Sequence, residues 1–488
     1  MEIKTRALRG FAWNHIAKVF DYVLAYLFSI LLARKLGALQ FGVYATVISI
    51  TTLLLHLSSL GFDTLLTKYT AQLLSNHGGS MIHRFIIRRL LSGRVLIILL
   101  LCISLLALKN PLSLLFRNEM LSIYLTIIVF YVFFQSLVLF NVNLLLGALK
   151  TKTIFLISVS ARAVNLATAY ILLTHGCEIK EILILITAVS FCTVVFYFSK
   201  TLSYFSGPST KSDVKPMLKF GLTVWVISIL TFILGKQSDI LLLNYFLGSS
   251  TEVGYYEVAF SFTQAIGYSF VIGLTGVSLA TFSELAVTDT QKLAKSWELI
   301  LKGMQLVLIP VLLYFIVYAG EIIPIIYTSS FNNSVILFRL FATLMLMSWI
   351  IGGGLNMTVL YSMGLQKSVL LSRSLSGLMN IVLNILFIPK LQAMGAIIAT
   401  GCSTILAISI ELFWVRSRID VRFPFNFLLK IVVISLFSLS LTFLYDVSHV
   451  KTLLISGLQY FFLFILLVYI FKIINLKKLF QYIFKSGQ

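Results

Sequence analysis

A few charged residues interrupt the long apolar stretches of this sequence. Lys18 and Asp21 form one pair and Lys236 and Asp239 form another, and residues three apart lie on one face of a helix. Arg162 lies in a third apolar stretch, with no acidic residue close to it in sequence. A charge inside a bilayer costs about 3 kcal/mol or more, so it normally faces a partner or a water-filled cavity. These residues are therefore the candidates for binding a polar substrate or coupling to an ion.

The chemistry that these residues could perform differs from site to site. A guanidinium group binds phosphate oxygens through two parallel hydrogen bonds, so Arg162 predicts an anion site. Lys236 and Asp239 predict substrate binding or ion coupling. For each acid–base pair the alternative is that its charges neutralise each other and serve only packing. Arg339 and Arg373 lie nearer the ends of apolar stretches, where we expect long side chains to extend to the membrane interface.

The apolar stretches themselves define the fold class. The chain is 59% hydrophobic and 11% charged, with a mean hydropathy of +1.00. A helix crosses the hydrocarbon core with about 20 apolar residues, whereas barrel strands alternate apolar and polar residues, a pattern missing here. The sequence predicts an all-α integral membrane protein with about 14 transmembrane helices. The predicted spans are 11–33, 41–61, 95–115, 121–146, 153–174, 181–202, 220–247, 255–280, 304–327, 335–360, 368–388, 395–415, 427–446 and 452–473.

The distribution of basic residues predicts the orientation. The connecting segments alternate between rich and poor in Lys and Arg, and the rich ones lie in the cytoplasm by the positive-inside rule. Both termini are then cytoplasmic. The net charge of +21 is explained by these loops and by anionic lipid, so no nucleic-acid partner is expected. Segment 62–94 mixes apolar and basic residues, which predicts a connector lying on the membrane surface.

The sequence also repeats itself. LLARKLGALQFGVYATV (31–47) matches LLLNYFLGSSTEVGYYEVA (241–259), and GALKTKTIFLISVSARAVN (147–165) matches GLQKSVLLSRSLSGLMNIV (364–382). In each match the second segment follows the first by six predicted helices. Because six is an even number, the two halves would have the same orientation in the membrane. We therefore expect an N-terminal six-helix lobe over residues 1–204, a C-terminal six-helix lobe over 205–418, and two additional helices with a cytoplasmic tail over 419–488.

Enzymatic chemistry is not indicated. The four cysteines form no CxxC pair, the six histidines are scattered, and the sequence contains no P-loop. We therefore expect no catalytic residues, no metal site and no direct use of ATP.

Four segments resemble one protein family. FAWNHIAKVFDYVLAYLFSILLARKLGALQFGVYA, followed by LGFDTLLTKYTAQ, resembles the opening of bacterial polysaccharide-exporter proteins. GKQSDILLLNYFLGSSTEVGYYEVA resembles their seventh-helix region, with its Lys-x-x-Asp and Gly-Tyr, and NIVLNILFIPKLQAMGAIIAT resembles their eleventh and twelfth helices. Over about residues 5–415 the sequence is similar to the polysaccharide transporter (O-antigen or Wzx-type flippase) family. That family belongs to the multidrug/oligosaccharidyl-lipid/polysaccharide exporter superfamily.

The resemblance implies two six-helix lobes around a central cavity. It implies a flippase that moves an undecaprenyl-diphosphate-linked oligosaccharide from the cytoplasmic to the outer leaflet of the bacterial cytoplasmic (inner) membrane by alternating access. Basic cavity residues would hold the diphosphate and sugars. Lys236 and Asp239 match the family's Lys-x-x-Asp, and coupling to an H⁺ or Na⁺ gradient would replace any cofactor. The implied partners are membrane lipids, a polysaccharide polymerase and chain-length proteins, as in lipopolysaccharide O-antigen synthesis.

Other functions stay open at this stage. A lipid II flippase has closely related chemistry. A cation-coupled drug exporter of the same superfamily would favour an acidic cavity, whereas the charges within the predicted spans are mainly basic. A membrane-bound polysaccharide polymerase or ligase would need a sizeable outer loop, and every predicted outer loop is short.

Overall fold

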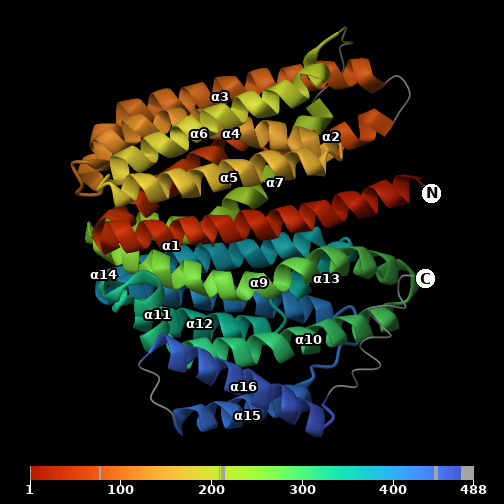
Figure 1. Ribbon diagram of the computed structural model, residues 1–488. Coiled ribbons are helices and arrows are strands. Elements are labelled where there is room, and N and C mark those ends of the chain that lie inside the picture. Colours follow the sequence, from red (N-terminus) through yellow and green to blue (C-terminus); the bar gives the residue numbers. More distant parts are fainter. Residues whose placement is uncertain (1, 76–78, 208, 210–214, 445–448, 474–488) are drawn as a thin grey trace. The chain divides into compact units, whose positions relative to one another are not determined.

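The computed structural model describes residues 2–75, 79–207, 209, 215–444 and 449–473, and the side chains of these residues except 2–18, 71–75, 79–80, 215–216, 268–281 and 444. Every regular element within these ranges is helical (Figure 1). The α-helices are α1 (Glu2–Ser59), α2 (Phe62–Ser75), α3 (Gly79–Leu115), α4 (Leu121–Gly147), α5 (Thr151–Thr174), α6 (Ile179–Phe205), α7 (Lys215–Ile233), α8 (Lys236–Leu247), α9 (Ser250–Thr288), α10 (Thr290–Val317), α11 (Ala319–Tyr327), α12 (Ser334–Ile350), α13 (Gly354–Ser362), α14 (Gln366–Arg416), α15 (Phe425–Ser440) and α16 (Val450–Ile470), with 3-10 turns at Ser329–Phe331 and Leu441–Leu444.

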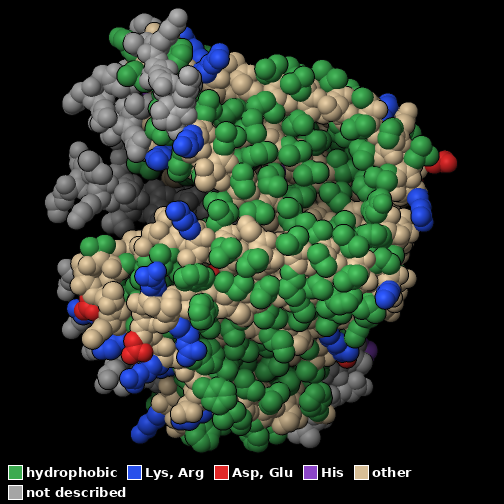
Figure 2. All heavy atoms as spheres, turned by 180° about the vertical axis from the view of Figure 1, so that it is seen from behind, with side chains coloured by type: hydrophobic (Ala, Val, Ile, Leu, Met, Phe, Trp, Pro, Cys, Tyr) green, Lys and Arg blue, Asp and Glu red, His purple; other side chains and the backbone are tan. Residues whose placement is uncertain are grey.

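The predicted fold class is confirmed: the protein is an all-α integral membrane protein. Ten of its described helices or helix pairs are long and apolar enough to cross a membrane, or eleven if the bent pair α7–α8 forms one span. Within the described residues, each predicted span falls mainly on one helix or on two consecutive helices, and residues 445–446 of the span 427–446 lie outside the described residues. On the face drawn in Figure 2, hydrophobic side chains cover most of the described surface, while Lys and Arg gather toward its edges. Such a surface is expected to face lipid rather than water.

Two predicted loops are sharp kinks, each at a single non-helical residue that separates two helical parts. α1 contains both of the first two predicted spans and breaks at Gly37, where φ is 72° and ψ is 175°. α14 contains the eleventh and twelfth predicted spans and breaks at Gln392, where φ is 53° and ψ is −132°. Glycine adopts a positive φ at little cost, whereas glutamine does so only when its surroundings impose it. The helix direction therefore changes at single residues.

The chain splits into two compact units. Unit 1 comprises residues 1–258 and 377–400, and unit 2 comprises residues 259–376 and 401–488. The lobe boundaries predicted from the repeat, at residues 204 and 418, remain a prediction. Each unit is described here by itself.

Unit 1 is built around α4. Figure 1 shows α3, α4, α5 and α6 side by side, and α4 packs against α3 and α6. α4 is apolar on nearly all sides, and Leu125, Ile128 and Val132 are fully buried within it. A helix that is apolar all round is normally buried on all sides or faces lipid. Here α4 provides the rigid centre against which the polar side chains of the neighbouring helices are positioned.

Segment 62–94 does not form a surface connector along its whole length. It contains α2 and the first part of α3, and Arg94 near its end is fully buried. The Arg94 guanidinium donates from Nη1 to Asp63 Oδ1 at 3.0 Å and from Nε to Ser136 Oγ at 2.7 Å. Arg94 therefore links the start of α2 to α3 and α4. The sequence did not indicate this, because Asp63 lies 31 residues away.

Replacing Arg94 with Met should lower the stability of unit 1. The change leaves the Asp63 carboxylate without its cationic partner, and breaking a buried ion pair costs about 3–5 kcal/mol. Because Asp63 is 27% exposed, water will offset part of that loss, and we expect about 2 kcal/mol. The melting temperature of the purified protein would fall, while the exposed-site variant Lys200→Met should melt like the wild type. Equal melting of the Arg94 variant would contradict a structural role.

Unit 2 packs α10 against α12, α15 and α16. The N-terminus of α10 is capped by Asp289, whose carboxylate accepts from the backbone N–H groups of Gln291 and Lys292 at 3.0 Å each. These donors, first that of Lys292, hold the pKa of Asp289 below its usual value. Further along α10, Tyr314 Oη donates to the Leu453 carbonyl at 2.8 Å, which ties α16 to the helix. The two C-terminal helices α15 and α16, neighbours in Figure 1, are thus integral to unit 2.

Candidate substrate pocket and ion site

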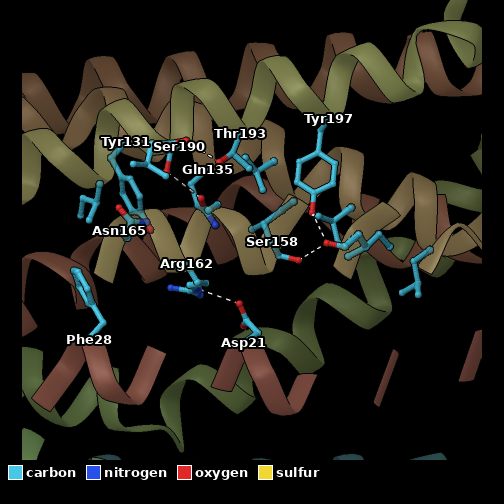
Figure 3. A pocket seen from close by; sticks show the side chains of 18 of the residues that line it. Asp21, Phe28, Tyr131, Gln135, Ser158, Arg162, Asn165, Ser190, Thr193 and Tyr197 are labelled. Carbon is cyan, nitrogen blue, oxygen red and sulfur yellow. Dashed lines mark hydrogen bonds and ion pairs between the residues drawn. The ribbon is translucent and has the colours of Figure 1, made fainter. Parts of the chain in front are cut away.

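A polar pocket opens among helices of unit 1. It has a volume of about 360 Å³ and is lined by side chains of α1, α4, α5 and α6 (Figure 3). Ligand pockets usually measure about 300–1,000 Å³. Polar groups inside a bundle of membrane helices face one another or a wet cavity, because lipid cannot satisfy them. The pocket is therefore the candidate substrate site.

Arg162 and Asp21 form an ion pair in this pocket. Arg162 Nε lies 3.0 Å from Asp21 Oδ1, and the two side chains are 45% and 40% exposed. Figure 3 shows them on facing helices, Arg162 on α5 and Asp21 on α1. The partner of Asp21 is thus Arg162, 141 residues away, which sequence spacing could not reveal. The side chain of Lys18 lies outside the described residues, so its predicted pairing with Asp21 stays a prediction.

Neutral polar side chains share the rest of the pocket lining with apolar ones such as Phe28 and Val138. Ser190 Oγ donates to Gln135 Oε1 at 3.4 Å, and Asn165 Oδ1 is buried without a hydrogen-bond partner. In Figure 3 the Asn165 amide and the Gln135 amide lie on the same side of the pocket as Tyr131. Sequence reasoning missed these groups because it considered only charges. The signal was there, since Gln135 and Asn165 are amides inside apolar helices.

The charges of the described residues that line the pocket balance each other. Among its lining residues, Arg162 and Asp21 are the charged ones, and they pair with each other. The remaining polar groups are amides, hydroxyls and phenols. The arrangement can therefore donate and accept hydrogen bonds without attracting ions of either sign over long distances.

A second polar cluster in unit 1 surrounds Asp239, which is fully buried on α8. We name Asp239, Tyr256, Asn380, Asn384 and Thr400 the Asp239 cluster. The carboxylate accepts from Tyr256 Oη at 2.6 Å, from Thr400 Oγ1 at 2.5 Å and from Asn384 Nδ2 at 3.0 Å. Asn380 donates to Thr400 at 2.9 Å and accepts from Asn384 at 3.0 Å. The cluster thus joins α8, α9 and both parts of α14.

The Asp239 cluster has the composition of a site for a hard cation. A carboxylate, two amides and two hydroxyls supply only oxygen ligands, which such cations prefer. The Asn384 Oδ1 atom is buried without a hydrogen-bond partner, so the cluster holds an unused acceptor. Asp239 lies in the first turn of α8, just after the chain bends by 54° between α7 and α8. In transporters, the ends of broken membrane helices commonly contribute to ion sites.

Lys236 and Asp239 contact neighbouring residues of α9. Lys236 Nζ forms an ion pair with Glu257 Oε1 at 2.5 Å, while Asp239 accepts from Tyr256. The predicted common face of the pair is thus directed toward α9. The charge of Lys236 meets a carboxylate that the sequence analysis did not consider.

Arg339 and Arg373 have partners within the protein, and their extension to the membrane interface stays a prediction. Arg373 Nη2 lies 2.9 Å from Glu411 Oε1, and Glu411 is fully buried in unit 2, so this arginine binds an internal acid. Arg339 donates to the carbonyls of Ile316 and Val317, each at 3.1 Å. These are carbonyls that the end of α10 leaves without helical partners. Neither arginine needs the membrane interface to satisfy its charge.

The sequence matches one described family. A profile described as "Polysaccharide biosynthesis protein" matches residues 31–336, which is more than half of the chain. The chain belongs to the polysaccharide biosynthesis protein family. An uncharacterized membrane protein of Methanocaldococcus jannaschii is 22% identical to this chain, and the alignment covers 98% of this chain and 97% of that protein.

Solved structures of similar fold are transporters. The lipid II flippase MurJ in its inward closed conformation matches with a TM-score of 0.74 and 18% identity, covering 94% of this chain and 98% of MurJ. An inward-facing multidrug resistance transporter of the MATE family matches with a TM-score of 0.64 and 15% identity, covering 82% of this chain and 94% of that one. At these identities the likeness shows the fold alone. This polysaccharide biosynthesis protein is thus a multi-pass membrane protein with the fold of these transporters.

Proposed function

We propose that this protein is a flippase that carries an undecaprenyl-diphosphate-linked oligosaccharide across the bacterial cytoplasmic membrane. The observation that carries the proposal is the polar pocket of about 360 Å³ among helices of unit 1, in a chain of the polysaccharide biosynthesis family. A polar headgroup needs such a pocket to pass through hydrocarbon, while its lipid tail stays in the bilayer. The cytoplasmic position of both termini and the passage of the glycan to a polymerase and chain-length proteins are parts of this proposal.

The alternatives fit the pocket less well. A cation-coupled drug exporter would bind its cationic drug at a carboxylate in the pocket, but Asp21 is already bound to Arg162. A lipid II flippase has the support of the fold likeness to MurJ. It differs from the first proposal only in the glycan carried, so the lipid that accumulates distinguishes the two. An O-antigen repeat, a capsule repeat and lipid II have different masses.

The Asp239 cluster is the proposed coupling site. A Na⁺ ion would be held by the Asp239 carboxylate, the hydroxyl oxygen of Thr400 and amide oxygens of Asn380 and Asn384. A proton would instead bind Asp239 directly. Since the cluster joins α8 to both parts of α14, occupancy by either ion would alter the packing of these helices. That is how ion binding would bias alternating access.

Depletion of the protein in its native bacterium tests the proposed function. Mass spectrometry of the lipid fraction should detect a complete undecaprenyl-diphosphate oligosaccharide that accumulates on the inner leaflet. Its mass would identify the glycan and would separate O-antigen, capsule and lipid II. If no lipid-linked intermediate accumulates and the cells become sensitive to cationic dyes, the drug exporter is the better interpretation.

Arg162→Ala and Lys236→Ala should each impair export without preventing insertion into the membrane. Each removes a charge-assisted contact worth about 1.5–3 kcal/mol, which corresponds to roughly a tenfold to hundredfold loss of transport rate. Export is measured as surface polysaccharide at matched protein level. The control is Lys200→Ala, an exposed basic residue outside the pocket, which should export normally. Normal export by both test variants would mean that neither residue contributes to substrate binding or coupling.

A further inference from the structure

We infer that the pocket holds an uncharged sugar unit of the transported glycan and excludes the diphosphate. This inference rests on the proposed function and specifies which part of the substrate the pocket takes. It differs from the expectation that Arg162 forms an anion site, because the structure provides Arg162 with an anionic partner of its own.

The charge of the pocket is the first argument. Arg162 Nε lies 3.0 Å from Asp21 Oδ1, so the guanidinium is already neutralised. A diphosphate entering the pocket would gain Arg162 but would also meet the Asp21 carboxylate at close range. Like charges close together repel, and this repulsion persists although the two side chains are partly exposed. An uncharged polar group avoids this repulsion.

The hydrogen-bonding groups of the pocket are the second argument. Arg162 uses Nε for Asp21, which leaves its two terminal nitrogens as donors beside the second carboxylate oxygen of Asp21 as an acceptor. Adjacent hydroxyl groups on a sugar ring both donate and accept, so a neighbouring donor and acceptor match them. The Asn165 Oδ1 atom adds a buried acceptor without a partner. A buried acceptor of this kind is costly unless a ligand satisfies it.

The shape of the pocket is the third argument. A volume of about 360 Å³ lies at the lower end of the usual range of about 300–1,000 Å³, which suits a monosaccharide-sized group rather than a complete oligosaccharide. Tyr44 and Tyr131 contribute aromatic rings to the lining, and a sugar ring has apolar C–H faces that such rings can cover. Apolar faces with polar edges are properties of a sugar and not of a diphosphate.

Binding to the full-length protein in lipid nanodiscs tests the inference. The probes are free N-acetylglucosamine, glucose and galactose, titrated one at a time and followed by saturation-transfer NMR, with sodium diphosphate as a competitor. The test variants are Asn165→Leu and Gln135→Leu, which remove pocket amides. Asn165→Leu should fold normally, because it removes an acceptor that has no partner. The matched control is Thr187→Val on α6, which loses a hydroxyl outside the pocket that bonds only the Leu183 carbonyl.

We expect at least one sugar to bind the wild type and the Thr187 variant equally, and to bind the Asn165 and Gln135 variants roughly tenfold more weakly. Diphosphate should not displace it. The inference is overturned if no sugar binds, if both pocket variants bind like the wild type, or if diphosphate competes. Lipid analysis of depleted cells is independent of this result. Accumulated lipid-linked glycan without sugar binding would reject the pocket assignment alone, whereas the absence of that lipid would reject the flippase.

Discussion

Replacing Asp239 with Asn is expected to reduce ion-driven transport by roughly a hundredfold. Asn has nearly the shape of Asp but lacks the negative charge that a bound cation requires. Removing one partner from a buried charge pair costs about 3–5 kcal/mol, and about 2.7 kcal/mol already corresponds to a hundredfold. The rate would be measured in proteoliposomes with the lipid-linked glycan from depleted cells, under an imposed Na⁺ gradient and separately under an H⁺ gradient.

The comparison with a neutral surface change makes this result specific. Asp420→Asn removes an exposed carboxylate of unit 2 and should transport like the wild type under both gradients. The gradient whose effect disappears in the Asp239 variant identifies the coupling ion. If the Asp239 variant transports within twofold of the wild type under both gradients, the cluster is structural and coupling occurs elsewhere.

The helices and the positions of their breaks could be predicted from the sequence, but the backbone geometry of the breaks could not. A run of about 20 apolar residues has few alternatives to a membrane helix, so each predicted span falls on helical structure. The break at Gln392 lies between the predicted spans 368–388 and 395–415, but its positive φ occurs at a residue type that rarely adopts it and could not be predicted. The break at Gly37 was predicted as a loop because glycine suits both structures.

The candidate residues could be predicted better than their partners. Composition indicated Arg162, Asp21, Lys236 and Asp239, since charges are rare in apolar segments. Which charges meet depends on how helices pack, and Arg162 meets Asp21 across 141 residues of sequence. The Asp239 cluster was harder still to foresee, because asparagine and threonine in a membrane helix usually serve packing. Only the arrangement of α8, α9 and α14 brings them to one carboxylate.

The two matched segments of the predicted repeat, 31–47 and 241–259, pair Gly37 with Gly248 and Gly42 with Gly254. Gly37 and Gly248 both have positive φ, 72° and 59°, but their ψ values of 175° and 23° differ. The second matched pair, Gly42 and Gly254, lies where α1 and α9 touch within unit 1. A Cβ atom on Gly42 would lie 1.7 Å from the Ser250 carbonyl oxygen, and one on Gly254 would lie 2.1 Å from that of Ala38. The two copies of the motif therefore pack directly against each other.

Gly42→Ala should therefore destabilise the protein strongly. The added methyl group overlaps a backbone oxygen, which cannot move aside as a flexible side chain can. Overpacking of this kind costs about 1–3 kcal/mol and sometimes more, so we expect the melting temperature to fall by about 2–5 °C. Scanning fluorimetry of the purified protein measures this change.

Gly303→Ala is the matched control for this prediction. Gly303 also lies inside a helix, α10, but a Cβ atom there meets nothing within 4 Å. Alanine favours the helix over glycine by about 0.5–1 kcal/mol, so this variant should melt at or slightly above the wild-type temperature. A fall for Gly42→Ala alone would establish that the contact between the repeated motifs stabilises unit 1. Equal melting of both variants would mean that α1 and α9 separate readily at this contact, and the glycine match would then reflect ancestry of the sequence rather than a packing requirement.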